Sequence, residues 1–155
     1  MCKQDVSRSV HPDIRCAEKE DLEHICQIEE ASFSSSWSRE QIADSIGGRY
    51  EKVLVCCMKG TVTGYIMYSM VCDEAELLRV AVLPEYRGCG YAGGLLEKML
   101  DDCRHNNIRS VFLEVREGNA AARRLYDENG FVQISIRKNY YSNPAEHAIV
   151  MEKSL

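Results

Sequence analysis

The chain contains 155 residues, of which 45% are hydrophobic and 28% are charged, and its net charge at pH 7 is −5. This length suits one domain around a single core, and the composition is typical of globular proteins. No apolar run approaches the roughly 20 residues that a membrane-spanning helix needs, and no Lys/Arg cluster is longer than Arg123-Arg124. The sequence therefore predicts neither membrane insertion nor direct binding to nucleic acid.

The eight cysteines form no Cys-x-x-Cys pair, and the nearby histidines complete no familiar ligand spacing. No metal site is therefore predicted. The N-terminus lacks the basic-then-apolar pattern of a secretory signal. We expect a cytoplasmic protein in which most cysteines are free thiols.

Apolar periodicity and turn residues predict a polar, flexible leader at residues 1–12 and one domain over residues 13–155. The domain's predicted elements are a strand at 14–17, helices at 20–32 and from the cap at 38, strands at 52–58, 61–70 and 75–82, a helix at 92–105, a strand at 110–116, a helix from 119 to 128, and strands at 131–139 and 147–153. Ser38-x-x-Gln41 is a capping-box pattern, and Asn119 is a typical N-cap.

The order of these elements predicts a mixed fold. The two runs on either side of Lys59-Gly60 predict an antiparallel hairpin. The strand, helix and strand between residues 75 and 116 predict a right-handed crossover between parallel strands. We therefore expect an α/β (α+β) architecture with a mostly antiparallel sheet of six to seven strands, a central parallel pair and about four flanking helices.

A glycine-rich loop between the strand at 75–82 and the following helix is the most informative segment of the chain. Glycines at 88, 90 and 93 allow sharp turns and a close approach of the backbone to a ligand. The first turn of the helix offers N–H groups that have no partner inside the helix. Such a loop is suited to phosphate.

This loop has three possible interpretations: a dinucleotide-binding loop, a P-loop and an ordinary strand-to-helix turn. Gly88-x-Gly90-x-x-Gly93 satisfies the dinucleotide fingerprint, with Glu114 about twenty residues downstream. However, five residues separate Val82 from the first glycine, and the chain after residue 116 is too short for a second nucleotide-binding half. A P-loop is excluded because no Gly-Lys-Ser/Thr closes the loop. An ordinary strand-to-helix turn remains a third interpretation.

Three segments carry a resemblance to a known family. Arg87-Gly88-Cys89-Gly90-Tyr91-Ala92 resembles the pyrophosphate loop of the GCN5-related N-acetyltransferase (GNAT) superfamily, which binds acetyl-coenzyme A (acetyl-CoA). Residues 113–131, which begin Leu-Glu-Val-Arg, resemble the second half of that superfamily, and residues 137–141 are similar to a segment of the RimI subfamily. The resemblance covers residues 14–153 and departs at Ala92, where glycine is common, and at Gly118, where serine is usual.

The resemblance implies a set of cofactor contacts. The loop residues would hold the diphosphate, main-chain groups of the preceding strand would pair with the pantetheine arm, and an asparagine would add a further contact. These cofactor residues are Val80, Ala81, Val82, Arg87, Gly88, Cys89, Gly90, Tyr91, Ala92, Gly93 and Asn119. Cys89 would lie beside the diphosphate, far from the acetyl group, so no covalent role is expected of it.

The resemblance also implies two catalytic residues. Glu114 would be the general base and Tyr126 the general acid that protonates the departing thiolate. Each has a simpler interpretation from the residues alone, because Glu114 can form a salt bridge with Arg79 or Arg116, and Tyr126 can pack in the core. Candidates for the wall that faces the acceptor are Phe33, Trp37, Arg137, Tyr140 and Tyr141. Phe33 and Trp37 can equally pack around the helix cap at Ser38. The other three can equally belong to a solvated aromatic hairpin.

The function that follows is transfer of acetyl from acetyl-CoA to the N-terminal amine of a protein by direct attack. The RimI-like segment implies a basic, small-subunit ribosomal protein as the partner. An α-amine has an ordinary pKa of about 7.7 to 8, whereas the pKa of lysine is about 10.4, so an N-terminal acceptor is easier to deprotonate. Alternatives are a lysine or small-amine acceptor, a non-catalytic CoA-binding module, or a dinucleotide oxidoreductase.

Overall fold

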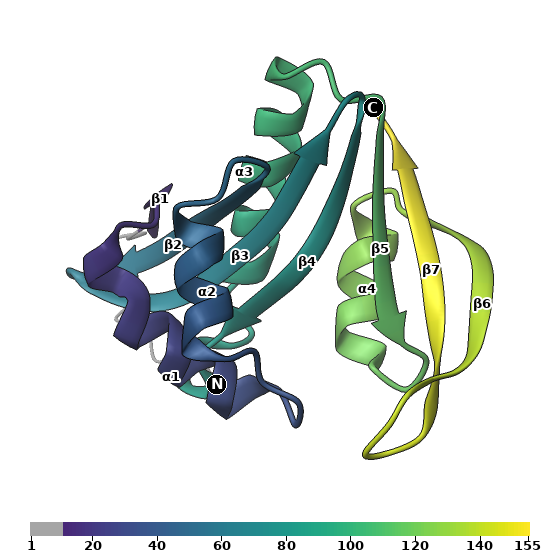
Figure 1. Cartoon of the computed structure of the whole chain (residues 1–155), viewed down its shortest axis with the longest axis horizontal. Coiled ribbons are helices and arrows are strands. Elements are labelled where there is room, and N and C mark those ends of the chain that lie inside the picture. Colours follow the sequence, from purple (N-terminus) through teal and green to yellow (C-terminus); the bar gives the residue numbers. More distant parts are fainter. Residues whose placement is uncertain (1–10) are drawn as a thin grey trace.

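The computed structural model describes residues 11–155, so the expected leader lies outside the described residues except for its last two positions. The strands are β1 Asp13–Cys16, β2 Glu51–Met58, β3 Thr61–Val71, β4 Glu74–Val82, β5 Ser110–Arg116, β6 Val132–Tyr141 and β7 Glu146–Ser154. The helices are α1 Leu22–Ser32, α2 Arg39–Ile46, α3 Tyr91–His105 and α4 Ala120–Glu128, with 3-10 turns η1 Lys19–Asp21 and η2 Pro84–Tyr86 (Figure 1).

The strands form one seven-stranded sheet in the order β1-β2-β3-β4-β5-β7-β6. β4 and β5 run parallel at its centre, and every other neighbouring pair is antiparallel. The predicted fold class, the hairpin of β2 and β3 and the central parallel pair are therefore confirmed.

The parallel pair is short, and this opens the sheet. β4 pairs with β5 only from Glu74 opposite Ser110 to Leu77 opposite Leu113. At that point β4 carries a bulge, because Tyr68 of β3 lies opposite Leu77 while Met67 lies opposite Arg79, which leaves one extra residue between them. A bulge bends its strand and increases its twist. Beyond it, β4 and β5 spread apart towards their carboxyl ends and form a wedge (Figure 1).

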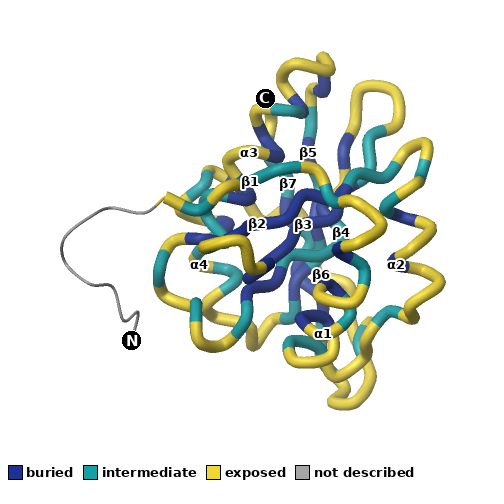
Figure 2. The backbone as a smooth tube through the Cα atoms, turned by 90° about the vertical axis from the view of Figure 1, so that its left-hand side faces the viewer, coloured by how far each residue is buried: buried dark blue, intermediate teal, exposed yellow. Residues whose placement is uncertain are grey.

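Helices cover the sheet on both faces. Ile25 and Ile28 of α1 and Ile42 of α2 pack on one face, against residues such as Tyr65 of β3. On the other face, α3 and α4 pack against alternate residues of β2 to β5 and of β7. Burial is concentrated in the central strands and on the inner sides of the helices (Figure 2). Each fully buried Leu, Ile or Met contributes about 1.5 to 3 kcal/mol through the hydrophobic effect.

Local signals explain most helix ends. The Gln41 N–H donates to Ser38 Oγ (3.2 Å) and the Ser38 N–H donates to Gln41 Oε1 (2.8 Å), which confirms the capping box. The first α-helix begins at Leu22, two residues later than expected, after the 3-10 turn. The reason is a further local contact, because the Asp21 carboxylate accepts hydrogen bonds from the Glu18 N–H and from Arg15.

Six cysteines of the described part are free thiols: Cys16, Cys26, Cys56, Cys57, Cys72 and Cys103. Residues 11–155 contain no helix that is both long and apolar enough to cross a membrane. The same residues contain no group of three or more His, Cys, Asp or Glu side chains placed to hold a metal ion.

Candidate active site

The glycine-rich loop lies at the carboxyl end of β4, where the wedge is open. Gly88 and Gly90 have φ angles of 76° and 82°, in the left-handed region that side chains with a Cβ rarely adopt. Gly90 is also the N-cap of α3, so the positive end of the helix dipole lies directly after it. The loop is therefore shaped by its glycines to present main-chain donors to an anion.

Arg87 holds this loop in place. Its Nε donates to the Val82 carbonyl (2.9 Å), and its Nη2 donates to Ser32 Oγ (3.3 Å) at the end of α1. The guanidinium thus ties the loop to the last residue of β4 and to the neighbouring helix. This contact with the protein's own chain was not foreseen from the sequence.

A cavity of about 490 Å³ lies between the loop, β4 and α4. It is lined by Ser32, Phe33, Val80, Ala81, Val82, Tyr86, Arg87, Gly88, Gly90, Tyr91, Ala92, Gly93, Asn119, Ala121, Ala122 and Leu125. Every residue predicted to contact the cofactor is among them except Cys89. The edge of β4 that faces the wedge is not paired with β5 beyond Leu77, so main-chain groups of this edge border the cavity. A diphosphate with an extended amide arm fits these donors and this edge.

A second cavity of about 540 Å³ adjoins the first. It is lined by Ser32, Phe33, Ser34, Ser35, Leu77, Leu78, Arg79, Val80, Leu113, Glu114, Val115, Arg116, Asn119, Ala122, Tyr126, Tyr141, Pro144 and Glu146. The residues common to both linings are Ser32, Phe33, Val80, Asn119 and Ala122. The predicted cofactor residues, except Cys89, thus line the first cavity, and the predicted catalytic residues Glu114 and Tyr126 line the second. The five common residues form a wall that the two cavities share.

Glu114 points from β5 onto the sheet face that is not packed against α3 and α4. Val111, Leu113 and Val115 of the same strand are buried on the opposite face. Arg137 of β6 donates from Nη1 to Glu114 Oε1 (2.5 Å). Glu114 thus forms a salt bridge, as the simpler interpretation expects, and its partner is Arg137 rather than either of the examples Arg79 and Arg116. The sequence did not show that β7 would pair with β5, which brings Arg137 of β6 within reach of Glu114.

Tyr126 lies near the end of α4 with only 6% of its surface exposed. Its ring packs edge-to-face on Phe131, with centroids 5.8 Å apart. Burial, and to a lesser extent Tyr141, raises the pKa of Tyr126 above its ordinary value of about 10. The phenol therefore keeps its proton throughout the neutral and mildly alkaline range. Asn119 caps the same helix, because its Oδ1 accepts from the Ala122 N–H (3.1 Å).

Arg79 organises the wall opposite Glu114. Its guanidinium lies over the rings of Phe33 (4.3 Å) and Trp37 (5.4 Å) and donates to the Ser35 carbonyl (2.9 Å). It also pairs with Glu29 of α1 at 3.3 Å, and this carboxylate is completely buried and accepts from the Tyr65 hydroxyl. Phe33 and Trp37 are thus held by Arg79, in addition to their position beside the cap.

Sequence reasoning missed Glu29 and considered Arg79 only as a partner for Glu114. One signal was available. Glu29 follows Ile25 by four residues and lies on the apolar stripe of its helix, where an unpaired carboxylate is costly. A charge at such a position indicates a buried partner.

Arg116 organises the loop between β6 and β7. It donates to the carbonyls of Pro144 (3.0 Å) and Ser142 (3.3 Å), pairs with Glu146 at 3.5 Å and lies over the Tyr141 ring at 4.3 Å. Tyr141 therefore lines the second cavity as expected, whereas Tyr140 and Arg137 lie outside the lining, beside Glu114.

The two loops that border the second cavity meet each other. Ser34 Oγ, between α1 and α2, donates to the Asn143 carbonyl (3.3 Å) of the β6–β7 loop. Segments more than a hundred positions apart in the chain thus face one another at this cavity.

We expect Glu29→Gln to lower the free energy of unfolding by about 2 kcal/mol, because it leaves the mostly buried Arg79 without its carboxylate while conserving side-chain size. Urea unfolding would measure the change. Glu30→Gln removes the same charge from the neighbouring exposed position of the same helix and should have an effect below about 0.5 kcal/mol. Equal effects of the two variants would contradict a structural role for the Glu29–Arg79 pair.

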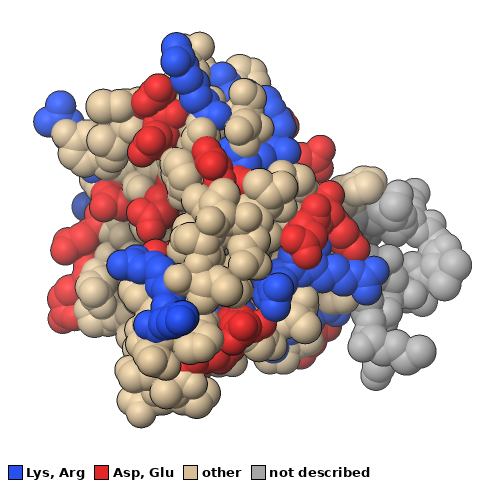
Figure 3. Space-filling view, turned by 90° about the vertical axis from the view of Figure 1, so that its right-hand side faces the viewer, with Lys and Arg blue, Asp and Glu red and all other residues tan. Residues whose placement is uncertain are grey.

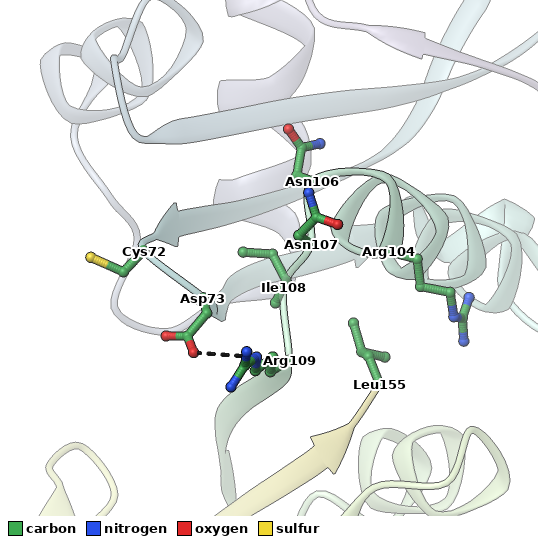
Figure 4. Close-up of a pocket in the computed structure, with 8 residues that line it drawn as sticks. All are labelled: Cys72, Asp73, Arg104, Asn106, Asn107, Ile108, Arg109 and Leu155. Atoms are coloured by element: carbon green, nitrogen blue, oxygen red, sulfur yellow. Dashed lines mark ion pairs between the residues drawn. The ribbon is translucent and has the colours of Figure 1, made fainter.

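A further hollow, of about 600 Å³, lies where the β3–β4 turn meets the α3–β5 loop (Figure 4). It contains none of the predicted site residues. Its charged groups already have partners, because Arg109 pairs with Asp73 (3.8 Å) and Arg104 pairs with Asp101 (2.9 Å). Although it is larger than the two cavities of the wedge, the free thiol of Cys72 is the only nucleophilic side chain among its lining residues.

Comparison with known proteins agrees with the geometry of the wedge. Residues 22–131 match the model of the Acetyltransferase (GNAT) family. This chain belongs to the GNAT family. It is an acetyl-CoA-dependent N-acetyltransferase.

Similar GNAT proteins cover almost the whole chain. The [ribosomal protein bS18]-alanine N-acetyltransferase of Haemophilus influenzae is 37% identical over 134 residues, which are 84% of this chain and 90% of that protein. The crystal structure of the ribosomal-protein-S18-alanine N-acetyltransferase from Escherichia coli is 32% identical, with a TM-score of 0.86 over 92% of this chain and 93% of that chain. Ard1 from Thermoplasma volcanium is 31% identical, with a TM-score of 0.87 over 94% and 99% of the two chains.

Proposed function

We propose that this GNAT enzyme acetylates the N-terminal α-amine of a protein, and that the acceptor is a basic, small-subunit ribosomal protein in the cytoplasm. The observation that carries the proposal is the shared wall between the two cavities, which lets a cofactor and a polypeptide meet at Val80 and Asn119. The names of the relatives from Haemophilus influenzae and Escherichia coli support the choice of a ribosomal acceptor.

The protein would hold the cosubstrate through its main chain. Amides of residues 88–93 and the N-terminus of α3 are suited to the diphosphate, and the open edge of β4 at Val80 to Val82 is suited to the pantetheine arm. When bound, acetyl-CoA supplies an acetyl group on a thioester that an amine attacks directly. Main-chain pairing along β4 would place that group at the shared wall, near a backbone N–H that stabilises negative charge on its oxygen.

Glu114 is proposed as the general base. It lines the second cavity and carries a carboxylate that accepts a proton from the acceptor's ammonium, directly or through water. This work is modest for an α-amine, with an ordinary pKa of about 7.7 to 8, and it costs about 4 kcal/mol at pH 7.5 for a lysine whose pKa is about 10.4. The chemistry therefore favours an N-terminal acceptor.

Tyr126 is proposed to stabilise the departing thiolate from the opposite side of the cavity. Because burial raises its pKa, its hydroxyl stays protonated and acts first as a hydrogen-bond donor to the sulfur. An ordinary thiol has a pKa near 8.5, so the stronger acid here is the thiol. Complete proton transfer from Tyr126 is therefore less favourable than the sequence suggested, and stabilisation by hydrogen bonding is the larger part of its role.

The acceptor cavity is suited to an extended N-terminal segment. Its lining includes Phe33, which Arg79 covers, and Tyr141, which Arg116 covers, whereas Trp37 contacts Arg79 but is not part of the lining. Aromatic and main-chain surfaces of this kind bind a peptide with limited dependence on its side chains.

A thiol-release assay with acetyl-CoA tests the proposal. We expect turnover with peptides copied from the N-termini of the host's ribosomal proteins, and none with the same peptides after their α-amines are blocked, because a blocked amine has no nucleophilic lone pair. Mass spectrometry would locate the acetyl group. Turnover with the blocked peptides alone would move the acceptor to lysine, and turnover only with small amines would exclude a protein acceptor.

A further inference from the structure

The proposed general base is already paired in the protein without its substrates. Arg137 Nη1 lies 2.5 Å from Glu114 Oε1, and the Arg137 guanidinium also lies over the Tyr140 ring at 4.5 Å. The Glu114 side chain is 23% exposed and the Arg137 side chain is 54% exposed. A carboxylate oxygen that accepts from a guanidinium cannot at the same time receive an ammonium from the same direction. Arg137 thus occupies one hydrogen-bonding site of Glu114 Oε1, and an acceptor ammonium that takes this site must displace it.

A second carboxylate explains why a cation is found there. Glu76 of β4 lies opposite Phe112 of β5, so it shares a sheet face with Glu114, two residues further along. Burial and then the charge of Glu114 raise the pKa of Glu76, whereas Arg137 lowers it. Glu114 thus lies near a second carboxylate, that of Glu76, as well as Arg137, with the aromatic ring of Tyr140 beside them.

Arg137 lies on the edge strand of the sheet, directly before an irregular stretch. β6 is the last strand of the sheet and has one free edge. Its pairing with β7 jumps from Arg137 opposite Ala148 to Tyr141 opposite Glu146, so residues 138–140 lie outside the regular ladder, and Asn139 has a φ of 51°. Ion pairs between exposed side chains contribute little to stability and are easily exchanged.

The surrounding surface has no single sign of charge. Figure 3 shows the side of the molecule formed by β6 and its neighbours, where basic and acidic side chains alternate around an uncharged strip. A long-range field of one sign is therefore absent on this face, and the local contact of Arg137 with Glu114 determines which cation the carboxylate meets.

We propose that Arg137 is a positioning residue that takes the place of the acceptor's α-ammonium on Glu114 until an acceptor displaces it. The inference rests on the proposed function. One cation leaves the carboxylate as another arrives, so the charge of the site is conserved while Glu114 is never left unpaired. The exchange favours acceptors that arrive as free ammonium groups, because an uncharged group cannot replace a guanidinium on a carboxylate.

Steady-state kinetics of Arg137→Gln would test this competition. We expect the KM for an α-amine peptide to fall about 3- to 10-fold, with kcat changed less than about 2-fold, because the acceptor no longer displaces a bound cation. Lys138→Gln removes the same charge from the adjacent residue of β6, which makes no ion pair with Glu114, and should leave both constants at wild-type values. If Arg137 instead only contacts the bound peptide as part of the cavity wall, Arg137→Gln should raise the KM, because a binding contact is lost.

Peptide binding provides a second measurement that needs no turnover. Calorimetry in the presence of CoA should show about 3- to 10-fold tighter binding of the peptide to Arg137→Gln than to the wild type. In a Glu114→Gln background, Arg137→Gln should change peptide affinity less than about 2-fold, because the pair is already broken. A higher peptide KM or weaker peptide binding in Arg137→Gln, or equal effects of Arg137→Gln and Lys138→Gln, would overturn the inference.

The two proposals fail in different ways. If the wild type acetylates α-amine peptides and Arg137→Gln has an unchanged or higher KM, the displacement inference fails and the proposed function stands. If the wild type neither binds nor acetylates such peptides, the proposed function fails first, and the displacement inference fails with it.

Discussion

Replacement of Glu114 by glutamine is expected to lower kcat at least about 100-fold while the affinity for acetyl-CoA stays nearly unchanged. The amide has almost the size of the carboxylate and still accepts a hydrogen bond, but it cannot take up a proton from the acceptor. Glu114 lines the acceptor cavity and is absent from the lining of the cofactor cavity. The loss should therefore appear in turnover, measured by thiol release, and not in acetyl-CoA binding, measured by calorimetry.

Glu117→Gln is the matched control for this prediction. Glu117 lies just beyond the end of β5, is exposed, and lines neither cavity of the wedge. Its replacement removes the same charge from the same region and should leave kcat within about 2-fold of the wild-type value. A wild-type rate for Glu114→Gln would remove Glu114 from the mechanism and leave it as the ion-pair partner of Arg137.

Gly90→Val is expected to weaken acetyl-CoA binding by at least about 100-fold. The φ of 82° at Gly90 is strongly disfavoured for a β-branched residue, so the loop must move to relieve the strain. Gly90 is the N-cap of α3, and a shift there turns the following N–H groups away from the diphosphate. Each hydrogen bond to a charged group contributes about 1.5 to 3 kcal/mol, so the loss of two is sufficient for this effect. Calorimetric titration with acetyl-CoA would measure it.

Gly60→Val separates the loss of binding from a general loss of stability. Gly60 has nearly the same conformation, with a φ of 80°, and lies in the turn between β2 and β3. At both glycines, the position that a Cβ would occupy has no neighbouring atom within 4 Å. Both variants should therefore be destabilised by a similar amount in urea unfolding. Only Gly90→Val should lose affinity for acetyl-CoA, and an equal loss in Gly60→Val would contradict the assignment of the loop.

The elements of the fold were largely predictable because their signals are local. The Ser38–Gln41 box and the Asn119 cap act within four residues, and the structure shows both. The parallel pair followed from a strand, a helix and a strand of suitable length. The late start of α1 was missed, because the contacts of Asp21 with Arg15 and with the Glu18 N–H were not recognised in the sequence.

The glycine loop and its helix were evident in the sequence because backbone conformation there is a property of the residues themselves. Positive φ angles at Gly88 and Gly90 need glycine, and a helix N-terminus follows directly. Glu114 and Tyr126 were found through a family resemblance, since a carboxylate in a strand and a tyrosine in a helix have many ordinary uses. The structure adds that both line one cavity.

The amino-acid sequence by itself determined the order of elements, the phosphate-type loop and the residue types available for acid–base chemistry, because these depend on interactions between near neighbours in the chain. Only the tertiary structure decided that β4 and β5 separate after Leu77, that Glu29 pairs with Arg79, and that Arg137 pairs with Glu114. The physical reason is that contacts between distant segments depend on strand order, register and bulges, which the packing of the whole sheet selects.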